Sequence, residues 1–518
     1  MEFDFQTKRP LVKIGVLQFE KKMIFSSNVP FRVEDISGNV LASGEKNRKY
    51  EAMVLNTTPP ASQIKIRLAI CYEHEEAQKI AEDWQGKNLE IHIERVGQKI
   101  QIATNKFIDN REYWVLTGEF ESYETADQVR RNLPDFGSYQ IIQVAENKIS
   151  GTISFEGKTI KDGIRIVPLG NSKLHFTLDN VRVGIGFHWD HRESQDLEGI
   201  LEFHIDKKGL LTAVNVLDIE KYLASVNSSE MTPDCNLEFL KAQTVVARCT
   251  VFATSGKHHF EDPFDLCADD HCQCFHGAGV IYEKSLQASV QTRGEILQHE
   301  GRVCDTRYAK ICAGIGESYK NVWDNRHIKY LDKFVDSQNG KNLNEILDNE
   351  KNIRTFIQSS HDVFCNPDYY QIPNYLEYAH DYYRWEAEYS PEEFGRIVAM
   401  KLGKDLGPIE DVIPLQRGDS GRIIYAKVIG ELGEAVIGKE LEIRNVLSKT
   451  HLYSSCFYVE KEMDSNGNLN QIRLKGAGWG HGVGICQVGA AVMGEEGYKY
   501  SEILNHYYQN TKLSALYN

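Results

Sequence analysis

Long hydrophobic runs are missing from this sequence. No stretch approaches the roughly 18 uninterrupted apolar residues that a membrane-spanning helix requires. Residues 1–22 also contain no apolar segment followed by a small-residue cleavage site, which is the pattern of a secretory signal. We therefore expect neither a membrane span nor an export signal in the sequence as written.

An excess of positive charge is missing as well. The 74 acidic side chains outnumber the 59 basic ones and give a net charge of −15. A surface of this sign argues against nucleic acid as the main ligand, because phosphates repel acidic side chains. The hydrophobic share of 41% and the charged share of 26% are typical of soluble globular proteins and exclude disorder as the dominant state. At roughly 150 residues per domain, the length predicts two to four domains.

Cysteines are too few and too scattered for a disulfide scaffold. The chain has eleven, an odd number, so at least one thiol is unpaired within the chain. Cys267, His271 and Cys272 nevertheless lie within six residues, and such soft or borderline ligands favour zinc. Candidates for a fourth ligand are His258, His259, Cys274 and His276. Four protein ligands would indicate a closed structural site, whereas the alternative is a set of reduced thiols without a metal.

The motifs of two common site classes are absent. Residues 476–489 contain six glycines, but His481 stands where a phosphate loop has its lysine, and the Gly-Lys-Ser/Thr ending is missing. No His-Glu-x-x-His occurs, which argues against a zinc peptidase or amidase. The glycine-rich segment suits a tight turn that presents Trp479, His481 and Gln487 to a sugar, or a tight turn that packs on a helix.

The order of predicted strands and helices divides the chain into three parts of an α+β, multidomain protein. Residues 1–62 alternate short apolar runs with turns and predict a β-rich N-terminal segment. Residues 63–147 predict a βαββαβ module, with strands at 64–70, 89–96, 113–120 and 139–144 and helices at 74–84 and 122–133. Residues 148–518 show no further boundary and predict one large mixed α/β domain.

The second half of the module, YWVLTGEFESYETADQVRRNL at residues 113–133, resembles the signature of SPOR domains. The shared features are an aromatic strand, Gly-x-Phe, a polar turn and a helix. In that family the uncovered sheet face binds peptidoglycan strands that have lost their peptides, so the resemblance implies a glycan-docking module. The alternative is a ferredoxin-like accessory domain, and the first half lacks the aromatic start of its strand.

One carboxylate is placed on a predicted buried helix face. Ile219, Tyr222, Leu223 and Val226 form an apolar stripe, and Glu230 follows Val226 by four residues on that stripe. An ionised carboxylate shielded from water is costly unless it is paired, so this position suits a general acid. The alternatives are a glutamate in a fraying last turn and a glutamate paired with Arg248.

Tyrosines are concentrated between residues 369 and 385, close to Trp385. Packing in a core or between domains is the first interpretation of this segment. Stacking on sugar rings is the alternative.

Several segments together resemble the SpoIID/LytB family of bacterial cell-wall proteins. They are VNVLDIEKYLASVNSSEM, LKAQTVVARC, FDLCADDHCQ, TRGEILQHEGRVCDTRYAKICAGIGES with NVWDNRHIKYL, and GWGHGVGICQVGA, in the family's order. The resemblance spans residues 195–515 and implies a SpoIID-type catalytic domain that remodels peptidoglycan. Several members of the family are lytic transglycosylases that act on denuded glycan strands.

The resemblance also implies roles for single residues. Glu230 corresponds to the glutamate of the family's Ser-Glu-Met-Pro motif and would be the catalytic acid, with Thr232 in place of the proline. The expected substrate-binding residues are Gln243, Arg248, Tyr330, Trp479, His481 and Gln487. Cys267, His271 and Cys272 match the family's zinc-binding pattern, and His259 is preferred as the fourth ligand by proximity.

Two segments depart from the family's pattern. Where the family has Phe/Tyr-His-Ser-x-Ser-Gly-Gly, this chain has Tyr308-Ala-Lys-Ile-Cys-Ala-Gly, so that Lys310 and Cys312 replace hydroxyl side chains. The family's Gly-Met-Ser-Gln becomes Gly-Ile-Cys-Gln, with Cys486 before Gln487. Substrate contacts at the first segment can therefore differ from those of the family.

The expected function is a peptidoglycan lytic transglycosylase that cleaves the MurNAc–GlcNAc bond of denuded strands and leaves 1,6-anhydroMurNAc ends. The alternatives are a hydrolase and a non-enzymatic amidase enhancer, which would bind glycan and stimulate a cell-wall amidase. The family implies the cell envelope as the location, and the missing signal leaves the cytoplasm as the alternative.

Overall fold

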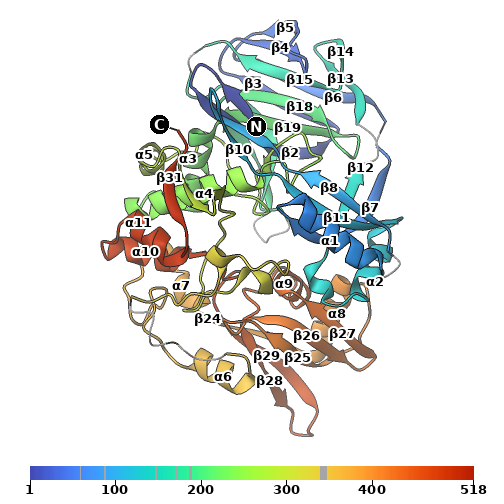
Figure 1. Cartoon of the computed structure of the whole chain (residues 1–518), viewed down its shortest axis with the longest axis vertical. Coiled ribbons are helices and arrows are strands. Elements are labelled where there is room, and N and C mark those ends of the chain that lie inside the picture. Colours follow the sequence, from blue (N-terminus) through green and yellow to red (C-terminus); the bar gives the residue numbers. More distant parts are fainter. Residues whose placement is uncertain are drawn as a thin grey trace.

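The computed structural model describes residues 1–58, 60–86, 89–145, 149–170, 172–185, 190–338, 343 and 347–517 (Figure 1). Over these residues the chain is a mixture of helices and strands in several sheets, which confirms the mixed α and β character. The boundary that we expected between residues 147 and 148 falls outside the described residues. None of the described helices has both the length and the apolar composition needed to cross a bilayer.

Two sheets pack face to face at the top of the molecule in Figure 1. The first has the order β1-β2-β19-β18-β15-β4-β5, with β20 on β2, and comprises β1 (Glu2–Asp4), β2 (Arg9–Glu20), β4 (Phe31–Asp35), β5 (Val40–Gly44), β15 (Gly163–Pro168), β18 (Ile200–Ile205), β19 (Leu211–Asp218) and β20 (Leu266–Cys267). The second has the order β14-β13-β6-β3-β16-β17 and comprises β3 (Lys22–Ser27), β6 (Lys49–Thr58), β13 (Ser150–Phe155), β14 (Lys158–Lys161), β16 (Phe176–Val183) and β17 (His191–Leu197). Aromatic rings join them: Phe25 lies 5.6 Å from Phe203 and Phe31 lies 6.2 Å from Phe176, measured between centroids.

Residues 1–62 share these two sheets with residues 150–218 and do not form a unit of their own. Strand β2 pairs with β19, from Leu11 opposite Asp218 to Glu20 opposite Leu211. The alternating apolar residues of β2 are buried beside β19, which lies about two hundred residues later in the chain. Local periodicity predicts a strand but does not identify so distant a pairing partner.

The βαββαβ module forms a four-stranded antiparallel sheet with the order β12-β7-β11-β8. Its elements are β7 (Ser62–Cys71), α1 (His74–Gln85), β8 (Ile91–Val96), β11 (Glu112–Phe120), α2 (Tyr123–Arg131), a short η1 (Phe136–Ser138) and β12 (Gln140–Ala145), with a separate hairpin of β9 (Lys99–Ala103) and β10 (Lys106–Asp109). Ser122 caps α2 as its sequence suggests, and Ala77, Ala81 and Ala126 pack both helices on one face of the sheet. The module is an insertion in the sandwich, because Thr58 of β6 and Ser150 of β13 are direct partners.

A group of helices packs beside the sandwich around the central helix α4 (Leu237–Thr254), which is buried along nearly its whole length. The other elements of this region are α3 (Ile219–Glu230), α5 (Glu283–Gln291), α10 (Gln487–Glu495), α11 (Tyr500–Tyr507), β21 (Glu295–His299), β22 (Arg302–Val303), β23 (Tyr308–Ala309), β30 (Ile485–Cys486), β31 (Lys512–Ala515), η2 (Tyr319–Asn321) and η3 (Lys329–Leu331). Strands β23 and β30 are parallel neighbours, although Tyr308 and its partner Ile485 lie 177 positions apart in the sequence.

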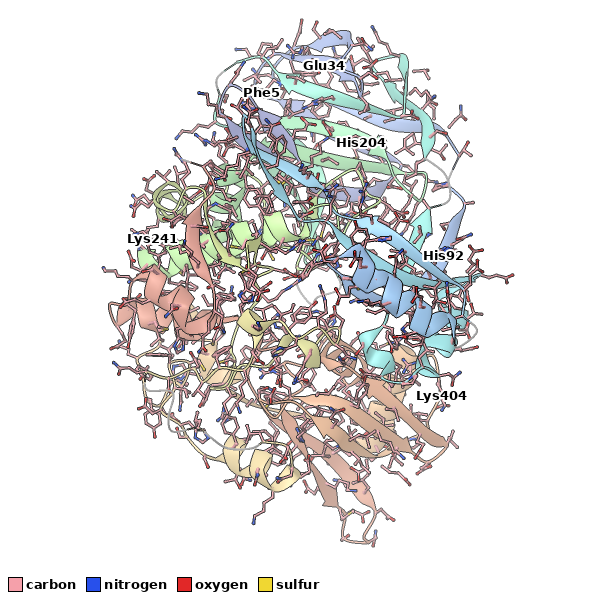
Figure 2. The ribbon with its side chains drawn as sticks, viewed as in Figure 1. Phe5, Glu34, His92, His204, Lys241 and Lys404 are labelled. Carbon is pink, nitrogen blue, oxygen red and sulfur yellow. The ribbon has the colours of Figure 1, made fainter. Side chains whose placement is uncertain are left out.

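Residues 384–477 contain a second hydrophobic core, which lies at the bottom of Figure 1. It is built by the sheets β24-β29-β28 and β25-β26-β27, from β24 (Arg384–Tyr389), β25 (Ile409–Arg417), β26 (Ile423–Gly430), β27 (Gly433–Gly438), β28 (Phe457–Met463) and β29 (Leu469–Ala477), with α6 (Glu350–Gln358), η4 (Asn374–Leu376), α7 (Ala379–Tyr382), α8 (Pro391–Leu402) and α9 (Glu440–Val446) around them. We call residues 384–477 the lower lobe. In Figure 2, Glu34 and His204 mark the sandwich in the upper half and Lys404 marks the lower lobe in the lower half. The expected single domain over residues 148–518 thus contains two separate cores.

The module contacts both neighbouring regions. The Asn110 side-chain amide donates hydrogen bonds to the carbonyl oxygens of Phe252 and Ser255 at the end of α4, at 2.8 and 2.9 Å. On its other side Arg131 pairs with Glu442 of the lower lobe. The module is therefore held between the helices and the lower lobe.

Candidate active site

Glu230 is the last residue of α3, and its carboxylate is held by three donors. The Tyr308 hydroxyl and the Cys274 backbone N–H donate to Oε1 at 3.1 and 3.3 Å, and Lys310 Nζ lies 3.4 Å from Oε2. The side chain is only 9% exposed. Glu230 is thus neither in a fraying turn nor paired with Arg248.

A cavity of about 770 Å³ begins at Glu230 and is lined by three parts of the chain. The helical region contributes Glu230, Asp270, Arg307, Tyr308 and Lys310, among others. The module contributes Arg67, Glu112, Trp114 and Gln140, and the lower lobe contributes Leu441, Arg444 and His451. The volume is that of a ligand pocket.

Trp479, His481 and Gln487, expected from the glycine-rich segment, all line this cavity. The turn that carries them needs glycine: Gly484 has φ +72°, and a Cβ atom there would lie 2.0 Å from the carbonyl oxygen of Arg307. Tyr382 supports Trp479 from behind, with ring centroids 4.5 Å apart. The tyrosine-rich segment therefore packs against the site wall, in line with the core interpretation.

His481 is a neutral imidazole in this arrangement. Burial, with help from nearby Arg444 and Arg307, lowers its pKa well below the ordinary value. Nδ1 accepts a hydrogen bond from the Val483 N–H at 3.0 Å, and the ring packs on Trp323 at 4.8 Å. Together with Trp479, these rings give one wall of the cavity an aromatic surface suited to sugar rings.

Arg248 does not contact Glu230, so the alternative in which these two residues pair is wrong. Its guanidinium is fully buried and forms a two-pronged ion pair with Glu220, at 3.0 Å from Nε and 2.5 Å from Nη2. Nη1 donates to the carbonyl oxygen of Glu295 at 3.0 Å. Glu220, in the first turn of α3, was not considered as a partner of Arg248 in the sequence analysis. Arg248 therefore stabilises the fold and lies outside the cavity lining.

Gln243 and Tyr330 also lie outside the cavity lining. Gln243 is fully buried on α4, and its amide has no hydrogen-bond partner among the described residues. The Tyr330 hydroxyl accepts a hydrogen bond from the Asp305 N–H at 3.0 Å, and its ring packs on His299. Both positions face the core, so neither can touch a ligand in this cavity.

The sheet face of the module that the helices leave uncovered is turned toward the cavity. Trp114 packs on Phe260, in the loop after α4, with centroids 5.1 Å apart. The guanidinium of Arg67 lies 4.4 Å above the Trp114 ring and donates to Gln140. Among the described residues Arg67 forms no ion pair with a carboxylate.

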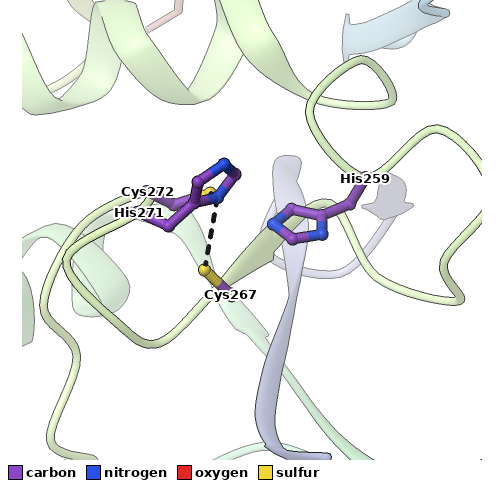
Figure 3. Close-up of side chains that lie close together, drawn as sticks. All are labelled: His259, Cys267, His271 and Cys272. Carbon is purple, nitrogen blue, oxygen red and sulfur yellow. Dashed lines mark hydrogen bonds between the residues drawn. The ribbon is translucent and has the colours of Figure 1, made fainter. Parts of the chain in front are cut away.

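The four expected metal ligands converge, as Figure 3 shows. The ligand atoms of His259, Cys267, His271 and Cys272 all lie within 4.8 Å of one another. His271 Nδ1 is 3.9 Å from Cys267 Sγ and 3.6 Å from Cys272 Sγ. Nδ1 of His259 bonds to Asp262 at 2.9 Å, while its buried Nε2 has no hydrogen-bond partner among the described residues. Two sulfurs and two nitrogens, one of them the unpartnered Nε2 of His259, fit a zinc ion.

Sequence reasoning missed the residues that hold Glu230. Tyr308 and Lys310 lie about eighty positions later in the chain, and Lys310 was noticed only as a departure from a family pattern. It also did not foresee Asp270, one of several further carboxylates in the cavity lining. The acidic run before His271 was the available signal.

Two protein-family models match parts of this sequence. Residues 207–299 match the family model of the stage II sporulation protein, SpoIID. The chain thus contains a SpoIID-type segment, and stage II sporulation protein D and an amidase enhancer are among its relatives. This SpoIID-type segment contains Glu230 and the four converging Cys and His ligands. Residues 317–484 match a domain of unknown function, DUF8618, which includes the lower lobe.

Relatives of the SpoIID-type chain extend over more than half of its length. Stage II sporulation protein D of Bacillus amyloliquefaciens is 26% identical over 58% of this chain and 76% of its own. An uncharacterized protein of Brachyspira hyodysenteriae is 27% identical over 58% of this chain and 68% of its own. The amidase enhancer of Bacillus subtilis is 24% identical over 57% of this chain and 40% of its own. The names of these relatives connect them with sporulation and with the enhancement of an amidase.

Proposed function

We propose that this protein is a lytic transglycosylase that cleaves the MurNAc–GlcNAc bond of denuded peptidoglycan strands and leaves 1,6-anhydroMurNAc ends. The observation that carries the proposal is Glu230, whose carboxylate is fixed by Tyr308 and Lys310 in the wall of a 770 Å³ cavity. A proton donor must be held rigidly beside the bond it protonates, and these contacts supply that rigidity.

Glu230 would serve first as an acid and then as a base. It protonates the glycosidic oxygen as the C1–O bond of MurNAc breaks, and the GlcNAc part leaves as an alcohol. The resulting carboxylate removes the proton from the C6 hydroxyl of the same MurNAc, whose oxygen bonds to C1. No water is consumed, Glu230 regains its proton, and the attacking group is intramolecular, which gives a large proximity advantage.

Lys310 and Tyr308 would support this cycle from opposite sides of the carboxylate. Lys310 stabilises Glu230 once it has released its proton, and Tyr308 fixes the direction of Oε1. Burial lowers the pKa of Lys310, but the attraction of Glu230 outweighs it and holds that pKa above its ordinary value. Lys310 is therefore a cation whenever Glu230 is ionised.

His259, Cys267, His271 and Cys272 would hold zinc as a structural ion. Four protein ligands leave no open position on a tetrahedral metal, so the ion would fix the loop and would not act on the substrate. The same loop carries Cys274, whose N–H contacts Glu230. Chelation is then expected to lower the melting temperature before it lowers turnover.

The module would bind the strand on the far side of the cavity from Glu230. A denuded strand carries a free lactyl carboxylate on each MurNAc, and Arg67 offers a cation that no carboxylate of the described residues pairs with. The uncovered sheet face of a SPOR-like module and the SpoIID-type catalytic residue would thus contact one substrate.

Digestion of denuded peptidoglycan by wild type and by Glu230→Gln tests the proposal. Loss of a general acid typically lowers the rate by about 10²–10⁴-fold. The rate at which anhydro ends appear in the mass spectrum should therefore fall by at least about 100-fold. Glu283→Gln, the same exchange on an exposed helix start, should leave the rate unchanged. Equal anhydro product from Glu230→Gln and wild type would remove Glu230 from catalysis.

Two specific observations favour other functions. Asp270 lines the same cavity and could act as the second carboxylate of a hydrolase. A hydrolase would give reducing ends, heavier than anhydro ends by one water. The similarity to an amidase enhancer favours a binding protein, which would give no product by itself and would bind glycan while stimulating an amidase.

A further inference from the structure

Three cysteines and an aspartate that the proposed reaction does not use meet in the interior of the molecule. They are Cys312, Asp336, Cys365 and Cys486, all buried, and their ligand atoms lie within 4.8 Å of one another. The four come from separate segments of the chain.

The distances within this cluster match a tetrahedral ion. Cys312 Sγ is 3.8 Å from Cys365 Sγ and 3.4 Å from Asp336 Oδ2. Zinc bonds of about 2.3 Å to sulfur and about 2.0 Å to oxygen place two sulfurs about 3.8 Å apart and a sulfur and an oxygen about 3.5 Å apart. A zinc ion would need little rearrangement of these side chains.

Surrounding groups orient the four ligands toward a common centre. Asp336 Oδ1 accepts a hydrogen bond from the Tyr507 hydroxyl at 2.7 Å and lies 3.6 Å from His506 Nε2, which leaves Oδ2 toward Cys312. The Cys312 N–H donates to Cys486 Sγ at 3.3 Å, and the Gly489 N–H donates to the same sulfur at 3.5 Å. Such outer contacts favour thiolates and fix metal ligands in direction.

Gly489 makes room for the aspartate. A Cβ atom at this position would lie 2.5 Å from Asp336 Oδ2 and 2.6 Å from the Tyr507 hydroxyl. The close approach of the α10 backbone keeps the carboxylate in place. An ionised carboxylate with no exposed surface costs several kcal/mol unless it is compensated, and a divalent cation supplies that compensation.

We propose that Cys312, Asp336, Cys365 and Cys486 form a second, structural zinc site. This inference does not depend on the lytic reaction. Cys312 follows Lys310 by two residues, and Cys486 directly precedes Gln487, so the ion would tie together the parallel strands β23 and β30 that carry the site wall. The metal would thereby hold Lys310 and Gln487 at a fixed separation.

Metal content of the purified full-length protein tests the site. Native mass spectrometry and elemental analysis should find two zinc ions per chain in wild type, one in Cys365→Ala, one in Cys272→Ala and none in the double variant. Cys304→Ala removes a buried thiol outside both clusters and should retain two. A single ion that Cys272→Ala abolishes and Cys365→Ala retains would overturn the proposal.

A second measurement covers the case in which Cys365→Ala does not fold. Cys272→Ala reconstituted with Co²⁺ should show the thiolate charge-transfer and tetrahedral d–d bands, because this variant retains only the new site. Thiol alkylation after denaturation with chelator and without reductant should label all eleven cysteines. A colourless cobalt form, or nine labelled cysteines from a Cys312–Cys365 disulfide, would overturn the proposal. One ion that is lost in Cys365→Ala alone would support this site and count against the first.

Discussion

At the scale of single residues, Arg248 and Glu220 show how a structural ion pair can be mistaken in sequence for part of a catalytic site. Glu220 accepts hydrogen bonds from Arg248, from the Ser289 hydroxyl at 2.7 Å and from the Tyr517 hydroxyl at 2.8 Å. Burial would raise the pKa of Glu220, but Arg248 and these hydrogen bonds hold it below the ordinary value of 4.5. Glu220 is therefore ionised at neutral pH and depends on Arg248.

Arg248→Met should lower the free energy of unfolding by about 3–5 kcal/mol at neutral pH, because it leaves the Glu220 carboxylate buried without its cation. In wild type the pair contributes stability above pH 4.5, and this contribution is lost as the pH falls through the lower folded-state pKa. In the variant, burial alone raises that pKa, so the deficit should shrink as acid protonates Glu220. Urea unfolding at several pH values measures both effects.

The double variant Glu220→Gln with Arg248→Met provides the control for this prediction. It removes both charges and should recover part of the lost stability. If Arg248 instead acted on substrate, the single variant would keep its stability and lose glycan binding.

The residues of the site differ in how well their roles and contacts could be predicted from the sequence. Glu230 could be singled out because its helix stripe is local, and His259, Cys267, His271 and Cys272 could be grouped because they lie within 14 residues of one another, as their convergence in the structure confirms. Lys310 could not be assigned to Glu230, because that contact depends on a strand pairing between distant segments. The group of Cys312, Asp336, Cys365 and Cys486 could not be predicted either, because its members come from distant segments of the chain.

At the scale of elements, the glycine-rich turn determines the shape of the site wall. Its backbone approaches β23 so closely that Gly484 lies against the Arg307 carbonyl oxygen. The parallel pairing of β30 with β23 then sets the position of Tyr308. A turn that is distant from Glu230 in sequence thus controls a residue that contacts it.

Gly484→Ala should displace β30 from β23 and reduce cleavage of denuded strands by at least about tenfold, with backbone strain of about 1–3 kcal/mol. The strain arises from φ +72° and from a Cβ atom 2.0 Å from the Arg307 oxygen. Release of anhydro ends and the melting temperature measure the two effects.

Gly497→Ala is the matched control for this change. Gly497 also has a positive φ, +91°, but a Cβ atom there would meet nothing within 4 Å. It should cost stability without reducing the rate. Equal rates in Gly484→Ala and Gly497→Ala would show that the close approach is unimportant for the site.

Sequence periodicity predicted the elements of the module well because each is amphipathic in its own right. The helices at α1 and α2 and the four strands lie within a few residues of the expected positions. The pairing of β2 with β19 and the separate core of the lower lobe were not foreseen. Both depend on contacts between segments whose local patterns are ordinary.

At the scale of the whole molecule, the module is an insertion that closes one side of the cavity. The chain leaves the sandwich after Thr58 and returns to it at Ser150, and these two residues pair directly between strands β6 and β13. Joining these residues through Asn-Gly, in place of residues 59–149, would restore a simple hairpin. The remaining sandwich and helices should fold, and Phe260 should become exposed because its contact with Trp114 is lost.

This shortened chain should bind denuded sacculi at least about tenfold more weakly than wild type, a loss of about 1.4 kcal/mol. In the full chain, Arg67→Met should reproduce part of the loss by removing one cation from the cavity. Arg95→Met, on an exposed position of the same sheet, should leave binding unchanged. Co-sedimentation with sacculi measures all three, and unchanged binding by the shortened chain would defeat the docking role.

If the proposed function holds, the insertion would also govern which part of a glycan strand can reach Glu230. The module is anchored at α4 through Asn110 and at the lower lobe through Arg131, so it bridges the cavity. The free end of a glycan strand can enter the cavity beneath the module. The middle of a long strand can enter only if the module first moves away. Trimming from the ends follows from this architecture: a solution of long glycan strands should keep most of its viscosity while small fragments accumulate from the first minutes.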